Sequence, residues 1–229
     1  EKKKDYMDAV LQAKIFSDYL HDASRQDLEE LIRESLGEAG ICDEDAYRII
    51  LLRMDLFLKE HVEPSKQVEI VQEGCRGVIG NQPCLAVCDI YEDYMILILS
   101  SNHDGRTIIW KQEIEKLTDV LCKNTGGSVQ CGISLLHSGT AQMGNAYAEA
   151  FSALNNAKIL KEKTLSYQVV KDRKNIYYKI PNQELKDLQY HITKNNFKGC
   201  QEIIRRIFKE MTDRCVNFEC VVMLSLIHI

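Results

Sequence analysis

Four charged residues stand where apolar runs of the chain end, and they could do chemistry there. Glu92 and Asp93 lie in the short connection between two apolar runs, and Arg53 and Asp55 close an earlier one. Carboxylate oxygens are common ligands of divalent cations. The same carboxylates also suit an ordinary polar turn. The residues around them distinguish between these two interpretations.

Other residue types with reactive side chains show no pattern that predicts a site. The nine cysteines include no C-x-x-C pair, so zinc and thioredoxin-type chemistry lack their usual spacing. Several lie in apolar runs, where a thiol acts as a small hydrophobe, and this usage favours a reducing cytoplasm. Gly126 and Gly127 precede a strand rather than a helix, unlike a phosphate-binding loop. Four histidines have no partner visible in sequence and are expected at the surface or in loops: His61, His103, His137 and His191.

The elements that position the charged residues follow from periodicity and from helix breakers. An apolar run over 46–54 predicts a strand covered on both faces, and Pro64 opens a helix to about Val78. Strands over 84–90 and 94–100 are predicted to form an antiparallel hairpin in the interior of the sheet. The later elements are a helix over 109–122, a strand over 128–135, an alanine-rich helix over 143–160 and a short edge strand over 166–170. This order predicts an α+β fold of ferredoxin-like pattern, with a mixed sheet packed by helices.

Helical extensions are predicted on both sides of this domain. A helix over 4–20 carries an apolar stripe for which the sequence offers no intradomain partner, so we expect it to pair across a two-fold axis in a homodimer. The stripe consists of Met7, Val10, Leu11 and Ile15. A second helix covers 25–36. After Pro181 two more helices follow, and a third begins near Phe218.

The middle of the chain resembles a known domain family. The predicted hairpin and helix, then the segment 129–134, then Tyr147-Ala148-Glu149-Ala150, are similar to the back half of the GGDEF domain. Active members of that family condense two GTP molecules into cyclic di-GMP. The chain looks more like the GGDEF-like domains of AraC-type regulators in Gram-positive bacteria, over about residues 46–167. Those regulators place the domain between an upstream receiver or membrane-anchored sensor and two C-terminal helix-turn-helix units.

The resemblance implies that the catalytic residues have been lost. Ile90 and Tyr91 stand where an active member needs two glycines, and Arg53 stands where it needs a metal-binding Asp. Other family positions are kept or changed as follows: Asp55 and Phe57 match, Leu58 replaces a Lys, His61 replaces an Asn, and Glu92 and Asp93 keep carboxylates. A fixed cation repels Mg²⁺, and side chains at the glycine positions block the approach of a nucleotide to backbone. We therefore expect no enzyme activity, no cofactor and no metal site.

The sequence thus predicts a degenerate GGDEF-like regulatory domain of a cytoplasmic AraC-type transcription regulator. The predicted divisions are a helical linker or dimerisation segment at 1–40, the domain at 41–180, a helical spacer at 181–223, and a tail at 224–229 that matches the translation of a sequencing adaptor. Partners would be a second copy and an upstream receiver or membrane sensor, with DNA bound only through a further domain and no membrane contact by this segment. A net charge of −5 provides no basic field for nucleic acid. The alternatives are a nucleotide-binding sensor derived from a diguanylate cyclase, a PucR- or CdaR-like regulator domain and an active cyclase, which the hairpin residues disfavour.

Overall fold

The computed structural model describes residues 2–22, 25–55, 62–92, 94–100, 110–173 and 182–213. By its contacts the chain separates into two compact units, 1–168 and 169–229. The predicted divisions after residues 40 and 180 remain predictions, although the first two helices share the core of the first unit.

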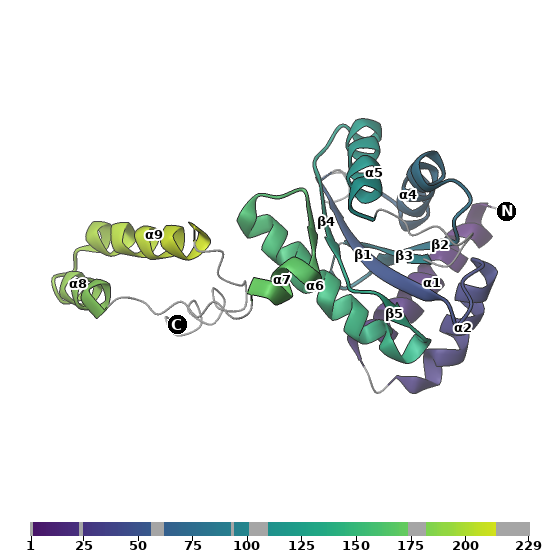
Figure 1. The fold of residues 1–229 in the computed structure, drawn as a ribbon, viewed down its shortest axis with the longest axis horizontal. Helices are drawn as coiled ribbons and strands as arrows, with labels where there is room; N and C mark the ends of the chain where they lie inside the picture. Colours follow the sequence, from purple (N-terminus) through teal and green to yellow (C-terminus); the bar gives the residue numbers. More distant parts are fainter. Residues whose placement is uncertain are drawn as a thin grey trace. The chain divides into compact units, whose positions relative to one another are not determined.

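A mixed sheet forms the centre of the first unit (Figure 1). Its strands run in the order β2-β3-β1-β4-β6, and the short β5 pairs with β1. Among the described strands β4 and β6 are parallel neighbours, and the remaining pairs are antiparallel. The strands are β1 (Ala46–Met54), β2 (Cys84–Asp89), β3 (Tyr94–Ser100), β4 (Val129–Ile133), β5 (His137–Ser138) and β6 (Thr164–Ser166). The predicted α+β class is confirmed.

Helices cover both faces of this sheet (Figure 1). α4 (Pro64–Ile79) and α5 (Trp110–Thr125) lie on one face, and α6 (Met143–Leu160) lies on the other. This arrangement explains why the run from Ile49 to Leu52 is fully buried, as predicted for a strand covered twice. The other predicted core residues, Val87, Ile96, Ile98 and Ile133, are buried too.

Two predictions about the strands were wrong in detail. The hairpin does form, but only β3 lies inside the sheet, because β2 is an edge strand. The last strand covers Thr164–Ser166 rather than 166–170, and Val169 and Val170 belong to the helix α7 (Tyr167–Arg173). Val170 is buried there, and packing outweighs the strand preference of a β-branched residue.

The first helix packs against the sheet. α1 (Lys2–His21) buries Ala13, Phe16 and Leu20 in the core and lies against β2 and α4. An edge strand exposes unpaired backbone groups, so a helix beside it protects it from pairing with another chain. α1 is followed by a 3-10 turn (Gln26–Leu28) and α2 (Glu29–Glu38).

The predicted stripe on α1 is divided between core and surface. Ile15 packs against the core and Val10 is half-buried, so the expectation that the whole stripe lacks an intradomain partner was wrong. Met7 and Leu11 are 57% and 58% exposed. The part of the stripe that is open to a partner is therefore centred on these two residues.

The second unit contains a helical hairpin of α8 (Asn182–Thr193) and α9 (Phe197–Asp213), as predicted after Pro181. The predicted helix near Phe218 and the tail at 224–229 lie outside the described residues. In the described part of the chain, no helix combines the length and the apolar character needed to cross a membrane.

Candidate functional site

The β2–β3 turn and the end of β1 lie at the same end of the sheet. Asp89 pairs with Tyr94 across the hairpin, and Leu52 of β1 pairs with Met95 of β3. Arg53, one residue further along β1, is therefore close to the turn in register. The topology thus places Arg53 near the hairpin turn. Four further residues named there, Phe57, Leu58, His61 and Asp93, lie outside the described residues.

The two remaining carboxylates do not meet in a metal centre. Asp55 accepts a hydrogen bond from the Ser128 hydroxyl at 2.6 Å, and its backbone N–H donates to the Ser128 carbonyl. Its carboxylate is thus engaged with the segment that precedes β4. Glu92 is exposed in the turn. Within the described ranges, no group of three or more His, Cys, Asp or Glu side chains is arranged to hold a metal ion.

A different carboxylate, Asp89, is the centre of the polar contacts at this end of the sheet. Its side chain is completely buried. The Tyr147 hydroxyl of α6 donates to it at 2.5 Å, and Nε2 of His21 lies 2.9 Å from the same oxygen. The backbone N–H of Tyr91 donates to its other oxygen at 3.0 Å. A buried carboxylate is tolerated because partners of this kind replace its lost water.

The C-terminal end of α1 is bonded directly to the turn. The Ser17 hydroxyl accepts a hydrogen bond from the backbone N–H of Ile90 at 3.0 Å, and the Tyr91 hydroxyl donates to the Asp18 carboxylate at 2.5 Å. Arg25 lies 3.5 Å from that carboxylate, and the His21 ring meets the Tyr91 ring edge-on. We call this set of contacts the α1–hairpin junction; it consists of Ser17, Asp18, His21, Asp89, Ile90, Tyr91 and Tyr147.

The electrostatics of the junction keep its phenols protonated. Burial, followed by the hydrogen bond to Asp89, raises the pKa of Tyr147 well above its ordinary value. The hydrogen bond to Asp18 is the main reason why the pKa of Tyr91 is also raised. A phenol that keeps its proton remains a donor to a carboxylate. The junction therefore fixes α1, β2 and α6 to one another through donors and acceptors that are matched.

Sequence analysis missed this junction. Asp89 was included in the strand as its penultimate residue, and His21 lay just beyond the end of the predicted first helix. A signal was present in Tyr147, which falls on the alanine-rich buried face of α6 beside Ala146 and Ala150. A phenol on such a face needs a polar partner. Nothing in the sequence indicated that this partner lies on β2, 58 residues away.

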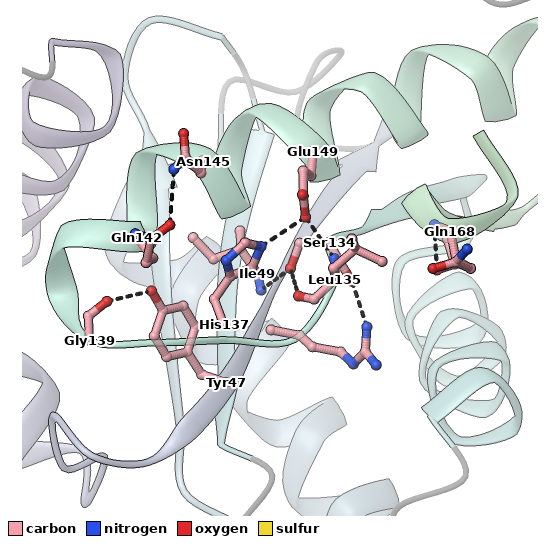
Figure 2. A network of polar contacts seen from close by, with 12 residues as sticks. Tyr47, Ile49, Ser134, Leu135, His137, Gly139, Gln142, Asn145, Glu149 and Gln168 are labelled. Atoms are coloured by element: carbon pink, nitrogen blue, oxygen red, sulfur yellow. Dashed lines mark hydrogen bonds and ion pairs between the residues drawn. The ribbon is translucent and has the colours of Figure 1, made fainter. Parts of the chain in front are cut away.

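A second polar network lies at the other end of β1, and Figure 2 shows it. The carboxylate of Glu149 on α6 accepts from the backbone N–H of Leu135 and lies 2.9 Å from Nε2 of His137. The buried Ser134 hydroxyl accepts from the backbone N–H of Ile49 at 2.9 Å, and the Tyr47 hydroxyl donates to the Gly139 carbonyl at 2.8 Å. The network joins β1, β5, α6 and the segment after β4.

The predicted surface or loop placement of the histidines was wrong for His137 and is untested for two others. His137 lies on β5 with a side chain that is 15% exposed, and Glu149 is its partner. His191 lies in the last turn of α8, where Nδ1 is 3.0 Å from the Asn196 amide nitrogen. His61 and His103 lie outside the described residues.

The buried thiols behave as hydrophobes, as the sequence predicted. Burial raises the pKa of Cys88 and of Cys131 to about 12, so neither is a thiolate near neutral pH. Cys75 of α4 and Cys84 of β2 are hydrogen-bonded to each other, which together with burial raises the pKa of Cys75. The same hydrogen bond lowers the pKa of Cys84, so the packing role applies to Cys75, Cys88 and Cys131.

A cavity of about 360 Å³ lies beside α5 and the start of β6. Its lining carries both signs of charge, and Lys163 and Asp119 form an ion pair in it at 3.1 Å. The cavity is lined by Glu115, Thr118, Asp119, Lys161, Glu162, Lys163 and Thr164. Its charges largely neutralise one another, so it indicates no particular class of ligand.

No model of a known protein family matches the chain. No curated protein matches it either.

Proposed function

We propose that this chain is a non-catalytic regulatory module that relays a signal within a cytoplasmic transcription regulator of the AraC type. The observation that carries the proposal is the α1–hairpin junction. In an enzyme of the GGDEF family, the turn must offer its backbone to a nucleotide. Here the backbone N–H groups of Ile90 and Tyr91 donate to Ser17 and Asp89 instead.

The side chains of the turn support the same proposal. Ile90 and Tyr91 occupy the positions of the family's two glycines and are 44% and 57% exposed. A turn with these side chains has no bare backbone against which guanine or phosphate could rest. Arg53 adds a positive charge at the end of β1 where the family places a metal ligand. Both features disfavour the binding of GTP with Mg²⁺.

The topology supports a ferredoxin-like, GGDEF-like assignment of the first unit. The order β2-β3-β1-β4 and the two intervening helices correspond to a β-α-β-β-α-β unit, with β6 added beside β4. This fold also serves many unrelated functions, so the functional proposal rests on the junction and not on the fold.

Signal relay would pass through α1. This helix packs on the edge of the sheet by one face, bonds the hairpin by its last turn and exposes Met7 and Leu11 on another face. A second copy that pairs through Met7 and Leu11 would hold α1 in one position, and a change in that pairing would strain the bonds to the turn. The module would thereby connect a sensor preceding α1 with DNA-binding units that follow the second unit.

Two observations together test this proposal. A thermal shift of the full chain with GTP and with cyclic di-GMP should be absent at concentrations on the order of 1 mM, because bound ligand raises the melting temperature. Stabilisation by either nucleotide would favour a nucleotide-binding sensor instead. The gene that encodes this chain should also encode paired helix-turn-helix units of the AraC type. A PucR- or CdaR-like DNA-binding end would contradict that part of the proposal.

A further inference from the structure

The α8–α9 hairpin of the second unit buries one row of side chains between its helices. Leu188 of α8 and Ile203 and Ile207 of α9 are buried. Glu184 and Arg206 form an ion pair at 2.8 Å, which joins the start of α8 to the later part of α9. The two helices are therefore antiparallel, and the ion pair marks one side of their contact.

A row of exposed apolar side chains lies on the opposite side of that contact. Leu185 and Ile192 are seven residues apart on α8, and Phe197 and Ile204 are seven apart on α9, so each pair shares a face of its helix. Viewed down the helix axes, both pairs lie on one side of the buried row. Glu184 and Arg206 lie on its other side. Their exposed fractions are 44% and 58% on α8, and 76% and 36% on α9.

The four exposed apolar side chains gather on one side of the helical hairpin. Scattered exposed apolar residues are ordinary, but a contiguous group over two helices marks a surface that associates with something. The charged residues that border the group are basic. Lys186 flanks it on α8, and Lys198 and Arg205, seven residues apart, flank it on the outer side of α9. The acidic residues Asp187 and Glu202 lie farther round each helix.

We propose that this face, formed by Leu185, Ile192, Phe197 and Ile204, docks an amphipathic helix of a protein partner whose apolar side is flanked by carboxylates. The apolar row supplies the buried contact, and Lys186, Lys198 and Arg205 select the sign of the flanking charge. This inference concerns the second unit alone and does not depend on the α1–hairpin junction.

The experiment uses the full chain and two synthetic helical peptides, each about four turns long. Both carry leucine along one face, and glutamates flank it in one peptide whereas lysines flank it in the other. The acidic peptide should bind with a Kd on the order of 10 μM, and the basic peptide at least about tenfold more weakly. Ionic strength of about 1 M, where the screening length is about 3 Å, should remove most of this preference.

Matched variants locate the binding. Replacing Leu185 and Ile204 together by Ser should weaken binding of the acidic peptide at least about tenfold. Tyr190→Ser is the control, because Tyr190 is 59% exposed on a different face of α8. Arg205→Glu should weaken binding, whereas Lys158→Glu on α6, an exposed charge of the first unit, should not. Circular dichroism confirms that each variant keeps its helices.

Three results would overturn the proposal. The first is equal binding of the two peptides or equal effects of the matched variants. The second is binding only after the chain is shortened to end at Asp213, which would make the chain's own last residues the occupant. The third is partition of the chain onto vesicles rich in anionic lipid with no peptide binding, which would assign the face to a membrane surface.

Discussion

Replacing Tyr147 by Phe removes one hydroxyl from the α1–hairpin junction and leaves the ring in place. That hydroxyl donates to the buried Asp89 carboxylate at 2.5 Å, and Tyr147 is 6% exposed. A hydrogen bond to a charged acceptor contributes about 1.5–3 kcal/mol, and a buried acceptor that loses a donor is not compensated by water. Asp89 keeps His21 and the N–H of Tyr91 as partners. We therefore expect Tyr147→Phe to lower the free energy of unfolding by about 1.5–3 kcal/mol.

The assay is urea unfolding followed by the fluorescence of Trp110, the chain's single tryptophan, which belongs to α5 and so reports on the first unit. With a slope of about 1–3 kcal/mol per molar urea, the midpoint should fall by about 1 M. Tyr47→Phe is the matched control, because Tyr47 is 2% exposed and donates to the neutral Gly139 carbonyl. Tyr47→Phe should lower the free energy of unfolding by about 0.5–1.5 kcal/mol. A cost for Tyr147→Phe no greater than that of the control would refute the assignment of Asp89 as the centre of the junction.

Three further predictions concern the same unit. Because the pKa of Tyr147 is raised in the folded chain, the unfolded chain loses the phenol proton first, near the ordinary pKa of 10.0. The stabilising contribution of Tyr147 is therefore complete below about pH 10 and is lost as the pH rises further. Wild-type urea midpoints should fall above about pH 10, and Tyr147→Phe should reduce that fall; an unchanged slope would contradict the argument. In the same assay, Gly132→Ala should lower the free energy of unfolding by about 1–3 kcal/mol or more, because the added Cβ would overlap the backbone of α6. Gly77→Ala, in open space on α4, should raise it by about 0.5–1 kcal/mol. In sedimentation velocity, the chain should dimerise with a Kd on the order of 10 μM and Leu11→Asp should be monomeric; a monomeric wild type would contradict pairing through α1.

Much of the fold could be predicted because its elements obey local rules. The apolar run around Leu51 has the composition of a strand that is covered on both faces, and Pro64 marks the start of α4. The hairpin followed from the short connection between two apolar runs. The position of β2 at the edge could not be predicted, because sheet order depends on contacts between segments far apart in sequence.

The junction could not be predicted for the same reason. It joins Ser17, Asp89 and Tyr147, which belong to three elements separated by more than fifty residues each. Periodicity identifies which face of α1 is apolar, but it does not say which part of that face meets the sheet. Ile15 was therefore assigned to a partner molecule, although it packs against the core of its own chain.

The central claim is that the hairpin has become a regulatory contact and no longer serves catalysis. The most direct measurement is incubation of the chain with GTP and Mg²⁺ or Mn²⁺, followed by chromatography of the products. Two-metal phosphoryl transfer needs both ions in place, and each loss of about 1.4 kcal/mol of transition-state stabilisation lowers the rate about tenfold. We predict no cyclic di-GMP above the level of a sample without protein. Cyclic di-GMP that forms with the wild-type chain and disappears when Glu92 and Asp93 are replaced by Ala would contradict the account.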